Sequence, residues 1–185
     1  MMQQKMYETE RLILKVLNEE AASQVLDYYK RNSSFLSEWE PERDESFYTV
    51  DHHSKLLQSD LAQMETGTAL KLWIFPKDHP DKVIGAIAFT NIIKGVFLSC
   101  YLGYKLDKDE VNKGYMAEAL QKGIDIMFDE YQLHRIEANI MPKNKASMRV
   151  VEKLGFYNEG LSYKYLKIHG KWEDHIHMVL LNDKV

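Results

Sequence analysis

Apolar residues recur along the chain in two arrangements, as short continuous runs and as longer stripes with helical spacing. Short runs rich in Val, Ile, Leu and aromatic residues, bounded by Gly, Pro, Asn or Asp, are typical of strands. This criterion predicts strands over residues 12–16, 70–75, 83–92, 96–104, 135–140, 163–168 and 172–181. The turn residues in 77–82 and 169–170 predict tight connections between neighbouring strands.

Helical spacing marks four segments between the predicted strands. Asn18, followed by two glutamates, is typical of a helix start, and we expect this helix to run to about residue 30. Further helices are expected over residues 50–65, after Gly114, and over residues 146–154 up to Gly155. The element order βαα, βββ, α, β, α, ββ predicts an α/β fold, in which one central mixed sheet carries helices on both faces.

The composition is that of an ordinary globular protein, with 185 residues, 45% hydrophobic and 28% charged. We therefore expect a single domain over residues 1–185. The one cysteine, Cys100, excludes an internal disulfide and a cysteine-based zinc cage, and it fits a reducing, cytoplasmic compartment. No leader segment and no long apolar run occur, so we expect no membrane association. The net charge of −4 argues against general affinity for nucleic acid.

Residues 102–120 are interpreted as a strand, a short polar loop around Gly114, and a helix. Such a loop directs several backbone N–H groups and the positive end of the helix dipole at one spot, which suits a pyrophosphate. We expect the N–H groups of residues 111–116 to form this site, and we expect Lys113 to contact a phosphate. The spacing alone is equally consistent with a tight turn that binds nothing.

Residues 142–156 place Asn144 and Ser147 at the start of a short helix. Taken alone, both residues are explained as capping or early-helix residues. His175 and His177 alternate on a predicted strand and therefore share a face. Two histidines could bind a metal, but no third ligand is evident, so no metal site is predicted.

The loop over residues 35–41 is aromatic and acidic. One interpretation is a surface loop in which Trp39 alone is buried. The other is a wall of an acceptor site, in which Glu38 or Glu40 attracts a cationic amine. The sequence leaves both interpretations open.

Segments 102–120 and 142–156 together look like the two cofactor motifs of the GNAT acetyltransferases, which hold acetyl-coenzyme A (acetyl-CoA). Over most of its length the chain also resembles the RimJ/RimL branch of ribosomal-protein-alanine N-acetyltransferases, and especially the RimJ type. The most specific marks are Cys100-Tyr-Leu-Gly-Tyr104, His134-Arg-Ile136, Met141-Pro-Lys-Asn-Lys145, Leu154-Gly-Phe156 and Asp174-His175. The resemblance implies a GNAT fold with a splayed sheet, acetyl-CoA as cosubstrate, and acetyl transfer to the N-terminal alanine of a ribosomal protein.

The resemblance also implies roles for individual residues. The pantetheine arm is expected in the gap where the sheet splays, with a backbone N–H there polarising the acetyl carbonyl. The expected cofactor-binding residues are Tyr104, Lys105, Leu106, Val111, Asn112, Lys113, Gly114, Tyr115, Met116 and Asn144. The expected substrate-binding residues are Glu38, Trp39 and Glu40. The amine attacks directly, Ser147 hydrogen-bonds or protonates the leaving thiolate, and Cys100 is not a nucleophile.

Three positions depart from the common family pattern. Val111 lacks a side-chain donor, Val151 stands where many members carry a tyrosine acid, and Asn139 stands where some N-terminal acetyltransferases carry a glutamate base. The pKa of a free α-amine is about 7.7–8.0 and that of lysine about 10.4, so roughly a tenth of N-termini but well under ~0.1% of lysines are neutral at pH 7. A site without a strong base therefore favours an α-amine, with Asn139 polarising a water that removes the proton. A nearby carboxylate such as Glu40 would reverse this argument.

Other functions stay open at this point. One is a GNAT enzyme that acetylates a small amine such as a polyamine or an antibiotic, and another is a ribosome-binding or assembly protein with little catalysis. A dinucleotide-binding domain is disfavoured, because no Gly-x-Gly-x-x-Gly follows a first strand. The oligomeric state is also open, and the family together with the aromatic C-terminal strands makes a homodimer one candidate.

Overall fold

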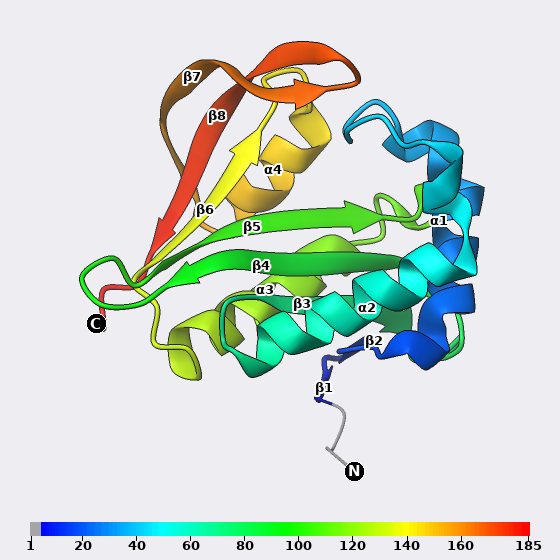
Figure 1. Ribbon diagram of the computed structural model, residues 1–185. Coiled ribbons are helices and arrows are strands. Elements are labelled where there is room, and N and C mark those ends of the chain that lie inside the picture. The colour runs from blue at the N-terminus through cyan, green and yellow to red at the C-terminus, as the bar shows by residue number, and fades with distance from the viewer. Residues whose placement is uncertain (1–4) are drawn as a thin grey trace.

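The computed structural model describes residues 5–185 and contains one eight-stranded sheet, with the order β1-β2-β3-β4-β5-β6-β8-β7 (Figure 1). The strands are β1 (Met6–Glu8), β2 (Leu12–Lys15), β3 (Leu70–Pro76), β4 (Gly85–Ile93), β5 (Ser99–Leu106), β6 (Arg135–Ile140), β7 (Tyr157–Ile168) and β8 (Lys171–Leu181). Strands β5 and β6 run parallel, and every other described pair of neighbours is antiparallel. The predicted mixed sheet is confirmed.

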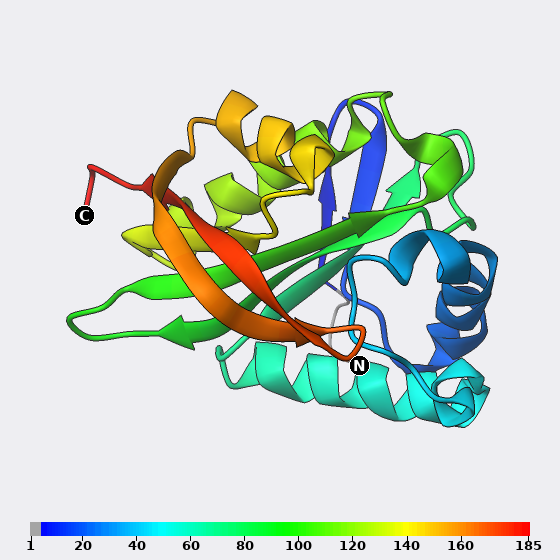
Figure 2. The same cartoon turned by 90° about the horizontal axis from the view of Figure 1, so that it is seen from above.

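Helices cover both faces of this sheet, as predicted. The α-helices are α1 (Ala22–Leu36), α2 (Val50–Glu65), α3 (Tyr115–Asp129) and α4 (Lys145–Lys153), and the 3-10 helices are η1 (Glu19–Ala21), η2 (Glu45–Tyr48) and η3 (Lys108–Glu110). Helices α1 and α2 lie on one face, and α3 and α4 lie on the other (Figure 2). Within residues 5–185, no helix is long and apolar enough to cross a membrane.

Strand β3 shows why the sheet needs a helical layer on each side. Its residues are apolar at nearly every position, and successive side chains of a strand point to opposite faces. Leu72 and Ile74 enter the core under α3 and α4, whereas Trp73 and Phe75 enter the core under α1 and α2. All four are at most 2% exposed, so both faces are closed by packing at this strand.

The boundaries of several elements differ from the sequence prediction. Helix α1 continues to Leu36 rather than about residue 30, because Asn32 and Leu36 are buried and hold its last turns against the protein. Strand β5 begins at Ser99 rather than residue 96, because the chain still turns at Leu98, whose φ is 43°. Strand β7 begins at residue 157, earlier than expected, and the short β1 was not predicted.

The sheet separates between β5 and β6. These two strands pair only from Ser99↔Arg135 to Tyr101↔Glu137, and then they diverge (Figure 1). Residues of β5 beyond Tyr101 still pair with β4 through Leu106, but they do not pair with β6. One edge of β5 is therefore open along a gap in the middle of the sheet.

Candidate active site

A cavity of about 810 Å³ lies at this gap. Its size falls within the range of ligand pockets in proteins, roughly 300–1,000 Å³. The predicted site residues that line it are Trp39, Glu40, Tyr104, Lys105, Leu106, Val111, Asn112, Gly114, Tyr115, Met116, Asn139, Asn144 and Ser147. Two predicted residues do not line it: Glu38 is exposed, and the ammonium of Lys113 pairs with Glu110 at 2.7 Å.

The loop before α3 has the backbone conformation of an anion-binding turn. Asn112 and Gly114 both adopt left-handed conformations, with φ of 62° and 81°. Gly114 forms the N-cap of α3 without a side-chain hydrogen bond, so the first N–H groups of the helix are not closed by a cap. These N–H groups, together with the helix dipole, favour an anion at the end of the cavity that Tyr115 and Met116 line.

Arg11 holds this loop from the N-terminal side of β2. Its Nη1 donates to the carbonyl oxygen of Lys113 at 2.9 Å, and its Nε donates to Glu118 Oε2 at 2.7 Å. The guanidinium also lies 4.6 Å from the centre of the Tyr115 ring. Sequence reasoning did not single out Arg11, because its partners lie more than 100 residues further along the chain.

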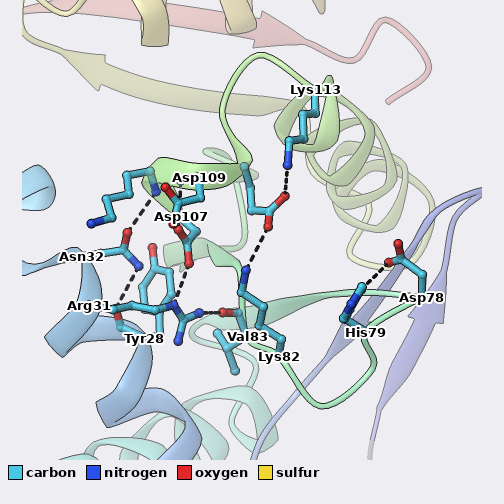
Figure 3. Close-up of polar contacts among 12 residues, drawn as sticks. Tyr28, Arg31, Asn32, Asp78, His79, Lys82, Val83, Asp107, Asp109 and Lys113 are labelled. Atoms are coloured by element: carbon cyan, nitrogen blue, oxygen red, sulfur yellow. Dashed lines mark hydrogen bonds and ion pairs between the residues drawn. The ribbon is translucent and has the colours of Figure 1, made fainter.

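The segment between β5 and this loop is fixed to α1 by a buried polar network (Figure 3). Asp107 is fully buried, and its carboxylate accepts from Arg31 Nε at 2.8 Å and from the N–H of Asp109 at 3.0 Å. Asn32 Oδ1 accepts from the N–H of Lys108 at 2.9 Å. Burial raises the pKa of Asp107. The hydrogen bonds from the Asp109 N–H, Arg31 and Asn32 lower it by more than burial raises it, so the pKa lies below the usual range.

A second group of ion pairs, centred on Glu110, also holds the loop before α3 in position (Figure 3). The carboxylate of Glu110 lies 3.0 Å from the ammonium of Lys82 and 2.7 Å from that of Lys113. Lys82 belongs to the connection between β3 and β4, so two distant segments meet at Glu110. The loop before α3 is thereby positioned before any ligand arrives.

On the α4 side of the cavity, two hydroxyl groups are in contact. Tyr104 Oη lies 2.6 Å from Ser147 Oγ, and it also donates to the carbonyl oxygen of Ser147 at 3.0 Å. Burial raises the pKa of Tyr104 to about 12, against a smaller lowering by the hydrogen bond to Ser147. Tyr104 therefore stays protonated at neutral pH, and it fixes the side chain of Ser147 at the cavity wall.

Asn144 combines the two roles considered for it. It is the N-cap of α4, and its Oδ1 accepts from the N–H of Ser147 at 3.1 Å. It also lines the cavity, and its side-chain NH₂ group donates no hydrogen bond to any described residue. The capping bond orients the amide, so that its NH₂ group is available as a donor to a ligand.

The opposite end of the cavity is formed by the loop after α1 together with β6. Trp39 and Glu40 line it there, and Glu40 forms an ion pair with the Lys105 ammonium. Lys105 Nζ also donates to Tyr29 Oη at 2.8 Å. Burial lowers the pKa of Lys105, but Tyr29 and Glu40 together raise it more, so that its pKa lies above the ordinary value. Glu40 is therefore held in place by a cation.

Asn139 contributes an unpaired acceptor to the same end. The apolar β6 residues Ile136, Ala138 and Ile140 face the core beneath α3 and α4, so Asn139 points to the other face. Its Oδ1 is buried, and no described residue donates a hydrogen bond to it. A buried unpaired acceptor costs free energy unless a ligand or water pairs with it.

Sequence reasoning missed His175 as a cavity residue. Asn139 pairs in register with His177 on β8, so His175, two residues earlier, lies on the same face as both. His175 is 3% exposed and lines the cavity, whereas His177 does not. His175 and His177 share a face of the sheet, as predicted, but their rings have different partners. The His177 ring contacts Ser162 Oγ and Glu137 Oε1, each at 2.6 Å.

Two further expectations concern Cys100 and the possible metal ligands. Cys100 is buried in the core beneath α3, and burial raises the pKa of its thiol to about 12, which leaves it a poor nucleophile. Among residues 5–185, no group of three or more potential metal ligands gathers in one place.

The fold and cavity are those of an acetyltransferase. The acetyltransferase (GNAT) domain family matches residues 11–157, which is most of the chain. The chain therefore belongs to the GNAT family of N-acetyltransferases, and it is an acyltransferase that depends on acetyl-CoA.

Individual relatives show which branch of this family the chain resembles. The ribosomal protein uS5-alanine N-acetyltransferase of Escherichia coli (strain K12) is 38% identical over 168 residues, which cover 91% of this chain and 86% of that protein. The ribosomal-protein-S5-alanine acetyltransferase from Vibrio fischeri has a TM-score of 0.92 at 33% identity, covering 97% of this chain and 98% of that one. Mycobacterium smegmatis RimJ in complex with CoA-disulfide has a TM-score of 0.88 at 26% identity, covering 94% and 83%. The resemblance to the RimJ type is confirmed.

Proposed function

We propose that this enzyme transfers the acetyl group of acetyl-CoA to the N-terminal α-amine, of alanine or serine, on a ribosomal protein. The observation that carries the proposal is the buried, unpaired Oδ1 of Asn139 in a cavity whose two carboxylates, Glu40 and Asp60, are each paired with a lysine. Such an end of the cavity suits an amine that is already partly neutral at pH 7, as an α-amine is. The identity to the uS5-alanine enzyme supports the ribosomal acceptor, and this acceptor would place the enzyme in the cytoplasm.

The cofactor side of the cavity fits acetyl-CoA, which supplies the acetyl thioester when bound. The open edge of β5 from Tyr104 to Leu106 offers backbone groups to the pantetheine arm in the manner of an added strand. The uncapped start of α3 at Gly114 and the neighbouring N–H groups suit the pyrophosphate. The free NH₂ group of Asn144 is a donor for the arm between them.

Ser147 and Tyr104 form the leaving-group side of the proposed site. Tyr104 Oη donates to the carbonyl oxygen of Ser147 at 3.0 Å and lies 2.6 Å from Ser147 Oγ, where either hydroxyl can be the donor. When the single Tyr104 proton turns from the carbonyl oxygen to Oγ, the hydroxyl proton of Ser147 can turn toward the departing thiolate. This pair fills the role of the tyrosine acid that is missing at Val151, because a hydrogen bond to sulfur stabilises the developing negative charge.

On the acceptor side, Trp39 and Glu40 form the wall that receives the amine, and Asn139 Oδ1 accepts one of its N–H groups. Holding the amine and the thioester together in one cavity supplies a large part of the rate, because it converts a bimolecular step into an effectively unimolecular one. Glu38 and Lys113 are left as contacts at the entrance, since neither lines the cavity.

The proposal is tested by acetyl-CoA turnover, measured as thiol release, with short peptides that differ only in their first residue. Peptides that begin with Ala, Ser or Met, a peptide with blocked Ala and an internal Lys, and spermidine form the panel. We expect turnover on free Ala and Ser termini and none on the blocked peptide. Turnover on the blocked peptide or on spermidine alone would contradict the α-amine assignment.

A panel of short peptides does not detect an acceptor protein that the enzyme recognises only in its folded state. The matching experiment uses purified ribosomal small-subunit proteins and locates the added acetyl group by mass spectrometry of intact N-terminal peptides. Acetylation of one N-terminus is expected. Binding of acetyl-CoA without acetylation of any peptide or ribosomal protein would favour a binding or assembly role instead.

A further inference from the structure

We propose that His175 is the proton acceptor for the attacking amine, with Nε2 as its basic nitrogen. This inference rests on the proposed function, because it assumes that an amine occupies the end of the cavity formed by Trp39, Asn139 and His175. It goes beyond that function, because it names the group that takes the proton. Asn139 is an amide, and the two carboxylates that line the cavity, Glu40 and Asp60, are paired with Lys105 and Lys71.

The hydrogen bonds of His175 fix which nitrogen carries the lone pair. Its Nδ1 lies 3.0 Å from the carbonyl oxygen of Glu173. A carbonyl oxygen can only accept, so Nδ1 must carry the hydrogen. In the neutral imidazole Nε2 then carries the lone pair, and no described residue forms a hydrogen bond with it. A base that is oriented in this way through its other nitrogen is the arrangement that general base catalysis requires.

The surroundings of His175 separate it from its neighbour on the strand. The ring of Tyr165, on β7, lies 5.7 Å from it in a tilted contact, and the register places Ser162 opposite it. Glu173 contacts it through the backbone, and the Glu173 carboxylate faces the Lys143 ammonium at 3.7 Å instead. His177 has a carboxylate partner, Glu137, and does not line the cavity. Of the two rings, that of His175 therefore lies at the cavity where the reaction is proposed, and that of His177 does not.

The proton balance of the proposed step is simple. The C–N bond forms as the C–S bond breaks, and the proton that the amine nitrogen loses moves to Nε2 of His175. The resulting imidazolium releases this proton to solvent when the product leaves. The thiolate is stabilised by the hydroxyl of Ser147 and takes its own proton from solvent, so the reaction consumes no further reagent.

The test compares His175→Gln with the matched control His177→Gln, both on the strand β8. Glutamine keeps a polar side chain but cannot accept a proton at neutral pH. We expect His175→Gln to lower kcat/KM about 10²-fold or more, with acetyl-CoA affinity unchanged within about twofold. His177→Gln should keep kcat/KM within about threefold. Equal losses in both variants would mean that β8 has only a structural role and would overturn the proposal, as would full activity of His175→Gln.

A second variant addresses the base role directly. His175→Ala opens space at the ring position, and added imidazole should restore part of its activity in a concentration-dependent way while leaving the wild-type rate unchanged. In wild type, both the amine and the imidazole must be unprotonated, so the acid side of the log kcat/KM profile should approach a slope of about two. In His175→Gln the slope should fall to about one. Absence of both rescue and slope change would refute the base role.

Each variant is assayed with both an Ala-starting peptide and spermidine. If wild type acetylates spermidine only, the proposed α-amine function fails. The comparison between His175→Gln and wild type on spermidine still decides the role of His175. The two inferences can therefore fail independently.

Discussion

The buried ion pair between Asp107 and Arg31 holds the region before α3, and its contribution to the free energy of unfolding can be calculated and tested. The perturbation is Asp107→Asn, which keeps the shape of the side chain and removes its charge. The single oxygen of the new amide can accept either from the N–H of Asp109, which lies 3.0 Å from the present Oδ1, or from Arg31 Nε, which lies 2.8 Å from the present Oδ2. In either orientation the NH₂ group faces the other donor, and the charge is lost.

The cost follows from burial and from what remains of the partners. The Asp107 carboxylate is 1% exposed, and breaking a buried ion pair costs about 3–5 kcal/mol when the other charge is stranded. Arg31 is not stranded, because it also pairs with Asp27 and donates to the carbonyl oxygen of Val83. We therefore expect a loss of about 2–3 kcal/mol, in the range of a hydrogen bond to a charged group. For a chain of this size that lowers Tm by about 4–12 °C.

The pH dependence has a definite sign. The folded pKa of Asp107 is lowered, so its contribution is present above the unfolded pKa of about 3.9 and is lost as pH falls through the lower folded value. Asp107→Asn should therefore destabilise the protein at pH 7 and leave it little changed relative to wild type at the most acid pH at which both fold.

The assay is thermal unfolding at several pH values, with Asp27→Asn as the control. Asp27 pairs with the same arginine but is 72% exposed, so its loss should cost no more than about 1 kcal/mol. The two variants remove the same type of charge from the same cation and differ in burial. If Asp107→Asn lost no more stability than Asp27→Asn, burial would not be the source of the effect and the calculation would be wrong.

Three other changes, with Gly67→Ala as a control, test the site and the core. Ser147→Ala should lower kcat about 10²-fold and leave the acetyl-CoA Kd within about twofold, and equal losses in both, or none, would remove Ser147 from the chemistry. Gly114→Ala, at φ 81°, should weaken acetyl-CoA binding by up to about 30-fold in titration calorimetry, from about 1–2 kcal/mol of left-handed strain. Gly67→Ala, at φ 69° in open space, should lower stability only. Gly123→Ala brings a Cβ within 2.9 Å of Phe89, so urea unfolding should show about 1–3 kcal/mol lost despite the better helix propensity, and a gain would contradict the packing.

The sequence predicted the helices and most strands because each carries its own periodicity. Strand β3 and helix α3 are long and apolar, and both formed within a residue or two of the predicted positions. The start of β7 was missed because residues 157–162 are mostly exposed and give little apolar signal. β1 was missed for a similar reason: it has only three residues, and its pairing partner β2 decides it rather than its own pattern.

The cavity-lining residues Gly114 and Asn144 were predicted from local sequence, since they act within their own turns. At the other end of the cavity, Trp39, Glu40 and Asn139 were also predicted, but His175 was not singled out. His175 was considered with His177 as a metal pair, because alternation on a strand shows that two side chains share a face but not which of them meets a cavity. That distinction requires the divergence of β5 from β6, which is a property of the whole sheet.

In the proposed site, the end of β5 contacts the residues assigned to both substrates. Successive side chains alternate in direction, so Tyr104 reaches Ser147 on the α4 face while Lys105 reaches Glu40 and Tyr29 on the α1 face. After Tyr101 the strand has lost its pairing with β6, so these side-chain contacts and the ladder to β4 are what hold its open edge in position. If this backbone receives the pantetheine arm as proposed, a change on either face should disturb it, and acetyl-CoA affinity and acceptor turnover should be coupled through this strand.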